Sequence, residues 1–251
     1  MSIAFFDSGI GGVTVLKRAM ELMPDESYIY YADTKNVPYG IKPKEDVKKY
    51  VINAVEFLAE KNIRALVVAC NTATSVVIND LRSMFSFPVI GMEPALKPAI
   101  IDNSGKKILV TATTLTLNES KLEDLINILD KEEKTEKMPL DKLVPFAERF
   151  EFNSAGVREY LEECFAGVDI NKYESIVLGC THFIFFKDIL KEILPGTIRI
   201  IDGNEGTVRH LISTLERQNL LGSNNKSGVE FFSSGVKDSP GRVEKLMSLL
   251  K

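Results

Sequence analysis

Short runs of branched apolar residues alternate along this chain with longer segments that carry apolar residues at helical spacing. Such runs are typical of buried parallel strands, and they lie at residues 3–6, 28–31, 65–69, 88–90, 107–110, 175–178, 198–201 and 229–232. Helices are expected at residues 13–23, 45–60, 74–84, 118–129, 154–165, 185–193, 205–218 and 239–250. Residues 131–137 mix charges of both signs and are expected to form a solvated turn or helix end. The alternation predicts an α/β fold with parallel sheets covered by helices.

Cys70 and Cys180 lie in nearly matching settings. Each follows an apolar run and precedes polar residues and a helix-length segment. Ligands of open α/β sheets bind outside the carboxyl ends of the strands, so both thiols are expected to face a ligand crevice. The alternative for either cysteine alone is a buried core thiol. The repeated arrangement, with Asp7 after the first strand of one half and Thr113 after that of the other, predicts two related domains with a site between them.

Composition narrows the possible functions. The chain has 251 residues, 45% hydrophobic and 26% charged, and its net charge of −4 gives no support for nucleic-acid binding. Three cysteines do not make a disulfide framework. The first residues do not resemble a signal peptide, and no apolar run approaches the roughly 20 residues of a membrane span. A cytoplasmic protein that keeps its thiols reduced is therefore expected, without a membrane partner.

The glycine-rich turn at residues 7–12 differs from the known nucleotide loops. It lacks the Lys-Ser/Thr ending of a P-loop, and Thr14 stands where a dinucleotide fold places its third glycine. Asp7 would also repel a phosphate. Glycines still let the backbone approach a ligand and present N–H groups at a helix start, which suits a small carboxylate. The alternative is a purely structural turn.

The remaining polar groups leave several chemistries open. A zinc site of Cys70, Cys164, Cys180 and His182 lacks the usual ligand spacing, so no metal or other cofactor is expected. Cys180 with His182 as nucleophile and base leaves Cys70 unexplained. A thiol pair suits two-base proton transfer at a carbon stereocentre, with one thiolate removing a proton and the opposite thiol donating one. Asp7 beside one thiol and His182 beside the other are candidate assisting groups. His210 has no predicted role.

Seven segments together resemble the glutamate racemases of the cofactor-independent aspartate/glutamate racemase superfamily. They occur in the family's order and span nearly the whole chain. They are Asp7-Ser8-Gly9-Ile10-Gly11-Gly12, Tyr31-Ala32-Asp33, Pro38-Tyr39-Gly40, Ala69-Cys70-Asn71-Thr72-Ala73-Thr74, Gly91-Met92-Glu93-Pro94, Leu178-Gly179-Cys180-Thr181-His182-Phe183 and Ile200-Ile201-Asp202.

The resemblance implies two pseudo-symmetric α/β domains, residues 1–95 plus 207–251 and residues 96–206. It implies a cytoplasmic homodimer that interconverts L- and D-glutamate without a cofactor and supplies D-glutamate for peptidoglycan. Cys70 would act on the D-enantiomer and Cys180 on the L-enantiomer, with Asp7, His182 and Glu148 assisting. The implied substrate contacts are Asp7, Ser8, Tyr39, Gly40, Asn71, Thr72, Thr116, Thr181 and His182.

The chain departs from the family pattern mainly in its second half. Residues 117–119 differ from the usual continuation after Thr116, the Cys-Pro that commonly precedes the stretch ending at Glu148 is missing, and Ile184 replaces a usual proline. Two alternatives remain. One is an aspartate or hydantoin racemase of the same superfamily, and the other is an amino-acid-binding regulator without turnover. Residues 38–40 and 91–94 favour glutamate.

Overall fold

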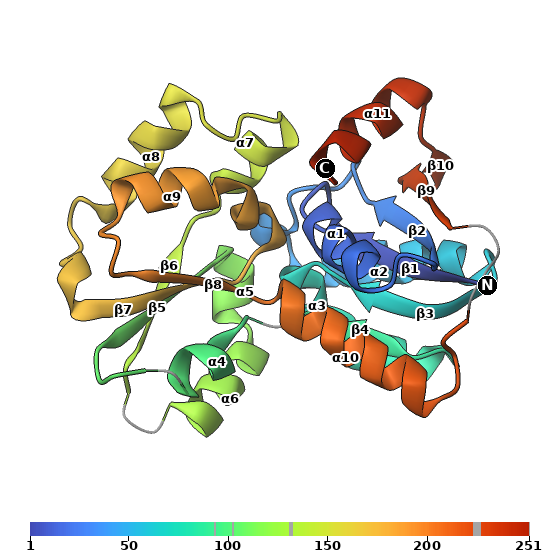
Figure 1. The fold of residues 1–251 in the computed structure, drawn as a ribbon, viewed down its shortest axis with the longest axis horizontal. Coiled ribbons are helices and arrows are strands. Elements are labelled where there is room, and N and C mark those ends of the chain that lie inside the picture. The colour runs from blue at the N-terminus through green and yellow to red at the C-terminus, as the bar shows by residue number, and fades with distance from the viewer. Residues whose placement is uncertain (93, 102, 131–132, 223–226, 251) are drawn as a thin grey trace.

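The computed structural model describes residues 1–92, 94–101, 103–130, 133–222 and 227–250, which form two lobes with one β-sheet each (Figure 1). The larger sheet has the strand order β10-β9-β2-β1-β3-β4, and the smaller has the order β6-β5-β7-β8. The run β2-β1-β3-β4 thus recurs as β6-β5-β7-β8. In each of these runs, the strand that comes first in the chain lies between the second and the third. This confirms the predicted fold class, a pair of pseudo-symmetric parallel α/β domains.

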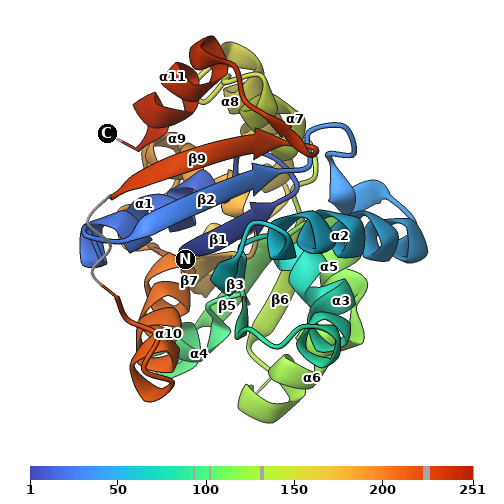
Figure 2. The same ribbon diagram turned by 90° about the vertical axis from the view of Figure 1, so that its right-hand side faces the viewer.

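The first domain is built on the larger sheet. Its neighbouring strands are parallel except for β9 and β10. Its strands are β1 (Ser2–Asp7), β2 (Ser27–Ala32), β3 (Ile63–Val68), β4 (Val89–Gly91), β9 (Gly228–Ser233) and β10 (Val236–Lys237). One face packs against α1 (Val13–Leu22), α10 (Asn204–Arg217) and α11 (Pro240–Leu249), and the other packs against α2 (Lys44–Ala59) and α3 (Asn71–Met84) (Figure 2).

The second domain is built on the smaller, entirely parallel sheet. Its strands are β5 (Lys107–Ala112), β6 (Thr135–Pro139), β7 (Tyr173–Leu178) and β8 (Arg199–Asp202). One face is covered by α4 (Leu96–Ile101), α5 (Thr114–Asn118) and α6 (Ser120–Leu129), and the other by α7 (Leu143–Glu148), α8 (Ala155–Phe165) and α9 (Lys187–Ile193). The short helices η1 (Tyr39–Ile41), η2 (Ile170–Lys172) and η3 (Thr181–Phe186) complete the structure. Within the described ranges, no helix is both long and apolar enough to cross a membrane.

The structure corrects several predicted elements. The expected turn at residues 131–137 contains the start of β6, whose charged residues are tolerated because it is an edge strand; Lys131 and Glu132 lie outside the described residues. The helix expected at residues 118–129 begins at Ser120, because Glu119 has extended backbone angles and separates α6 from α5. Helix α3 begins at Asn71 rather than at residue 74, since the Cys70 sulfur accepts the Ala73 N–H and caps the helix.

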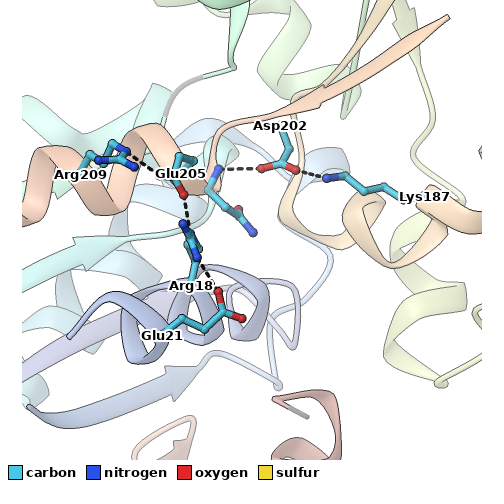
Figure 3. A network of polar contacts seen from close by, with 7 residues as sticks. Arg18, Glu21, Lys187, Asp202, Glu205 and Arg209 are labelled. Atoms are coloured by element: carbon cyan, nitrogen blue, oxygen red, sulfur yellow. Dashed lines mark hydrogen bonds and ion pairs between the residues drawn. The ribbon is translucent and has the colours of Figure 1, made fainter. Parts of the chain in front are cut away.

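The chain returns to the first domain between β8 and α10, where a network of charged side chains surrounds the crossing (Figure 3). Asp202, at the end of β8, pairs with Lys187 and accepts the Asn204 N–H at 2.8 Å. Glu205, in the first turn of α10, pairs with Arg18 and Arg209. The predicted boundary at residues 206/207 falls inside this first turn of α10, and both predicted domain boundaries stay predictions.

The first turn of α3 is held in place by Thr74, and its replacement by valine tests that contact. The Thr74 hydroxyl donates to the Val68 carbonyl at 3.0 Å and accepts the Met92 N–H at 3.1 Å. Thr74→Val keeps the shape and removes both hydrogen bonds of the hydroxyl, while the Met92 N–H keeps its bond to the Val68 carbonyl at 3.1 Å. We therefore expect the unfolding free energy to fall by about 1–1.5 kcal/mol in urea titrations. The control Thr197→Val changes an exposed threonine and is expected to stay within about 0.5 kcal/mol of the wild type. Equal stability of the two variants would contradict this role.

Candidate active site between the two sheets

The carboxyl ends of the two sheets point toward each other across the interface between the domains (Figure 1). Cys70 follows β3 and Cys180 follows β7, the corresponding strands of the two sheets. Their side chains are nearly buried, with 6% and 7% of their surfaces exposed. All residues predicted for the site gather at this interface, and their contacts form a few connected groups.

Cys180 begins a chain of contacts that ends in the other domain. Its sulfur lies 3.9 Å from Nδ1 of His182, and Nε2 of His182 lies 2.7 Å from Oε1 of Glu148. The same oxygen accepts the Ile10 N–H of the first domain at 2.7 Å. Burial alone would lower the pKa of His182, but Cys180 and Glu148 hydrogen-bond to it and raise its pKa well above the ordinary value. Burial would raise the pKa of Glu148, yet His182, the Ile10 N–H and Arg242 bring it below the ordinary value. His182 and Glu148, called the His182–Glu148 dyad below, therefore form an ion pair, with a protonated imidazole facing Cys180.

Asp7, at the end of β1 in the first domain, also makes a contact with the second domain. Its carboxylate accepts the Gly9 N–H at 2.9 Å and the hydroxyl proton of Thr181, from the second domain, at 3.0 Å. The side chain is completely buried, and this burial raises its pKa in spite of the nearby His182 charge. Asp7 is thus positioned to hold a proton more readily than a surface aspartate does.

Cys70 has a different environment from Cys180. Its sulfur accepts the Ala73 N–H at 3.4 Å, and its S–H group can donate to the Ser8 hydroxyl at 3.7 Å. Burial, together with the negative charge of Asp7, raises the pKa of Cys70 to about 12. Cys70 is therefore a thiol at neutral pH, whereas Cys180 has the protonated imidazole of His182 beside its sulfur.

Hydroxyl groups from both domains meet beside Cys70. Thr72 lies 2.9 Å from Thr113 and 3.0 Å from Thr116, and these two threonines lie 2.9 Å apart, all measured between hydroxyl oxygens. The neighbouring Asn71 is only 3% exposed, and neither its side-chain nitrogen nor its oxygen has a partner among the described residues. A buried carboxamide without partners is costly, so a bound ligand with both donors and acceptors would satisfy it.

The glycine-rich turn lies against the His182–Glu148 dyad. A Cβ atom at Gly11 would lie 2.6 Å from His182 Nδ1, and one at Gly9 would lie 2.9 Å from His182 Nε2 and overlap Glu148. These glycines let the backbone approach the second domain closely. Their predicted approach to a small carboxylate ligand stays a prediction. Gly40 likewise packs against Thr113, where a Cβ atom would clash.

The side chain of Tyr39, one of the predicted substrate contacts, is bonded within its own domain. Its hydroxyl donates to Asp33 at 2.6 Å, so we expect Tyr39 to contribute through its main chain. Burial and the Asp33 charge raise the pKa of Tyr39, which keeps it neutral. Asp33 and Thr113 are not among the residues that the sequence predicted for the site. The repeated arrangement had paired Thr113 with Asp7, and in the structure Thr113 directly follows β5.

The zinc alternative receives no support from the position of Cys164. This residue lies in α8 and interacts with Tyr160. In the part of the chain that the structure describes, no three or more His, Cys, Asp or Glu side chains are grouped so that they could hold a metal ion. Glu93, part of the segment at residues 91–94 that favoured glutamate, lies outside the described residues.

Comparisons with known proteins agree with the resemblance seen in the sequence. Residues 14–211 match the family model "Asp/Glu/Hydantoin racemase". A glutamate racemase of Halothermothrix orenii is 48% identical over 252 residues, which cover 100% of this chain and 99% of that protein. The crystal structure of a glutamate racemase isoform of Bacillus anthracis superposes with a TM-score of 0.86 at 29% identity, covering 98% of this chain and 94% of that one. The Escherichia coli glutamate racemase, in complex with L-glutamate and activator UDP-MurNAc-Ala, gives a TM-score of 0.83 at 28% identity, covering 99% and 94% of the two chains.

The raised pKa of His182 can be measured directly because the chain has only two histidines. In histidine-selective ¹⁵N NMR spectra, His182 is expected to stay protonated well above pH 6.5. Its interactions therefore contribute stability that is fully present below pH 6.5, the ordinary histidine value, and lost as pH rises through the raised pKa. In Glu148→Gln the hydrogen-bonded charge is gone, and the titration should move to lower pH by about 1 unit or more. An unchanged midpoint in Glu148→Gln would show that Glu148 does not control this proton.

Proposed function

Because the chain belongs to the Asp/Glu/Hydantoin racemase family, we propose that it interconverts L- and D-glutamate by moving a proton between Cys70 and Cys180. The expected enzyme class, an amino-acid racemase, is confirmed by full-length relatives that are glutamate racemases. The observation that carries the proposed mechanism is the pair of buried thiols at the carboxyl ends of corresponding strands in the two sheets. A substrate carbon between them would have one sulfur on each face.

Conversion of L-glutamate begins at Cys180 in this proposal. The Cys180 thiolate, which has the protonated His182 beside it, removes the α-proton and becomes a thiol. Cys70, a thiol at neutral pH, gives its proton to the opposite face of the α-carbon and becomes a thiolate. One C–H bond breaks and one forms, so D-glutamate leaves without any change in oxidation state.

Conversion of D-glutamate requires the opposite protonation state. The Cys70 thiolate removes the α-proton, and the Cys180 thiol donates one to the other face. Because burial and the Asp7 charge disfavour the Cys70 thiolate, its proton needs a nearby acceptor, and the buried Asp7 carboxylate is the candidate. Glu148 keeps His182 in the form that supports Cys180.

Substrate recognition is assigned to the polar groups around the thiols. The unpaired Asn71 carboxamide can accept from the substrate ammonium and donate to a carboxylate. Ser8, Thr72, Thr116 and Thr181 add hydroxyls, and the amino-terminal end of α3 faces the same region. Donors directed at the α-carboxylate stabilise the charge that develops on it when the α-proton leaves. The hydroxyls of Thr72, Thr113 and Thr116 bond to one another, so substrate binding would redirect them.

Glutamate is proposed as the substrate because the full-length relatives bear that name and one solved relative contains L-glutamate. Supply of D-glutamate for peptidoglycan, a cytoplasmic location and a homodimer are proposed with it, following the family resemblance. An aspartate or hydantoin racemase is the competing function, and the test below separates the two.

Cofactor-free racemisation of glutamate is the first outcome expected. Protein treated with a chelator and freed of pyridoxal phosphate should change the circular dichroism of L-glutamate toward zero at an undiminished rate. Aspartate should react with a much lower kcat/KM, because a site built for a distal carboxylate leaves its donors unpaired when that group is displaced. Equal kcat/KM for aspartate would favour the competing function, and activity only after adding pyridoxal phosphate or a metal would overturn the mechanism.

Separate roles for the two thiols are tested with serine variants. Cys70→Ser and Cys180→Ser should each lower racemisation by orders of magnitude, since both faces are needed. A glutamate analogue that eliminates a leaving group after deprotonation reports each face alone: Cys70→Ser should retain more reaction with the L-analogue and Cys180→Ser with the D-analogue. Cys164→Ser, which changes a cysteine of α8 outside the site, is the control and should behave as the wild type. The same enantiomer preference in both variants would indicate a single base.

A further inference from the structure

Lys44 and Glu119 form an ion pair that joins the two domains outside the candidate active site. Lys44 is the first residue of α2 in the first domain, and Glu119 lies between α5 and α6 in the second. The Nζ atom of Lys44 is 2.6 Å from Oε2 of Glu119. The helix does not explain this lysine, because a positive charge at the amino-terminal end of a helix opposes the helix dipole.

The two side chains of this pair differ in burial. That of Lys44 is 48% exposed, whereas that of Glu119 is only 9% exposed. A buried carboxylate is costly unless a cation or a hydrogen-bond donor compensates its charge. Lys44 supplies this compensation while the domains are together, and water would supply it if they parted. Loss of the Lys44 charge therefore disfavours the closed arrangement more than an open one.

Glu119 directly follows the part of the second domain that contributes to the candidate site. Its N–H donates to the Thr116 carbonyl at 3.4 Å. The hydroxyls of Thr113 and Thr116 in turn lie about one hydrogen-bond length from that of Thr72, in the first domain. A shift of Glu119 away from Lys44 would therefore move two of the three hydroxyls that meet beside Cys70.

Two further contacts lie along this edge of the interface. Leu115 of α5 packs against the core of the first domain that α2 and α3 cover. Gly40 lies so close to Thr113 that a Cβ atom would clash, and Lys44 comes four residues after Gly40. Figure 2 shows α3 and α5 next to each other here. The ion pair thus adds a charged contact to an edge where the two domains already pack closely.

Access to the thiols requires the domains to move. Cys70 and Cys180 are 6% and 7% exposed, which leaves no open path for a molecule that must lie between both sulfurs. A ligand therefore enters and leaves when the domains part, and parting at the α5 edge breaks the contact between Lys44 and Glu119.

We propose that Lys44 and Glu119 are positioning residues: their ion pair holds α5 against the first domain, keeps Thr113 and Thr116 beside Thr72, and limits how often the site opens. The inference rests on the proposed function for the identity of the substrate that enters. Neither Lys44 nor Glu119 touches the thiols or the substrate in this account.

Alkylation by iodoacetamide, a small uncharged reagent, tests the ion pair without turnover. The rates at the three cysteines are read separately by mass spectrometry of their peptides. In Lys44→Met, Cys70 and Cys180 should both react about threefold faster or more, because the pair no longer opposes opening. Cys164, in α8 outside the site, should react at the wild-type rate. A shared factor at the two buried thiols indicates opening, whereas a changed pKa of one thiol would alter one rate alone.

Two further variants separate this contact from a general loss of charge on α2. Lys48 lies one helical turn after Lys44 and pairs with Asp80 of α3, within the first domain, at 2.8 Å. Lys48→Met should therefore leave both rates unchanged. Lys44→Arg keeps the charge and should stay close to the wild type. Lys44→Met that matched the wild type, or an equal acceleration in Lys48→Met or in Lys44→Arg, would overturn the proposal.

Salt dependence and a double variant complete the test. Raising the salt concentration from about 0.05 M to about 0.5 M should accelerate alkylation of both thiols in the wild type more than in Lys44→Met, because salt screens the pair. If Lys44→Met did not fold, wild-type rates that are independent of salt would overturn the proposal. The double variant Lys44→Met/Glu119→Gln should be accelerated by less than the product of the two single factors, and a full product would show that the residues are not coupled. If these results hold while glutamate is not racemised, the proposed function fails and the positioning role of the ion pair stands.

Discussion

The arrangement of the two domains around the site depends on one carboxylate oxygen that makes contacts with residues of both domains. Oε1 of Glu148 accepts a hydrogen bond from the Ile10 N–H and lies 2.7 Å from Nε2 of His182. The first contact fixes the glycine-rich turn against the second domain, and the second holds a charged imidazole beside Cys180. Since Gly9 and Gly11 leave no room for a side chain here, the turn can approach closely enough to make both contacts at once. Domain arrangement and charge distribution at the site therefore have a common physical cause.

Much of the fold and of the candidate site could be predicted from local sequence patterns. Branched apolar runs before Cys70 and Cys180 indicated buried parallel strands, and the structure has both thiols at the ends of corresponding strands. Asp7 and His182 were expected beside the thiols because they are close to them in sequence or in the repeated pattern. The failures have a different origin: β6 contains charged residues and is specified by its pairing with β5, which local composition does not reveal.

Contacts between distant segments could not be predicted in this way. The ring of Thr72, Thr113 and Thr116 forms only because α3 of one domain lies against α5 of the other. The resemblance to a family provided Glu148, whose role depends on the arrangement of the two domains rather than on its own segment.

The unequal surroundings of the two sulfurs also affect how the enzyme recovers between turnovers. Under the proposed mechanism, the protein that releases D-glutamate has a Cys70 thiolate and a Cys180 thiol, the reverse of the form that bound L-glutamate. The free enzyme must then exchange these protons before it can accept L-glutamate again, and the burial of Cys70 sets the direction in which that exchange runs. At high substrate concentration, when binding is fast, this recycling of empty enzyme can limit the rate of net conversion. A mirror-image pair of substrates is thus processed by a site whose two resting forms differ in free energy.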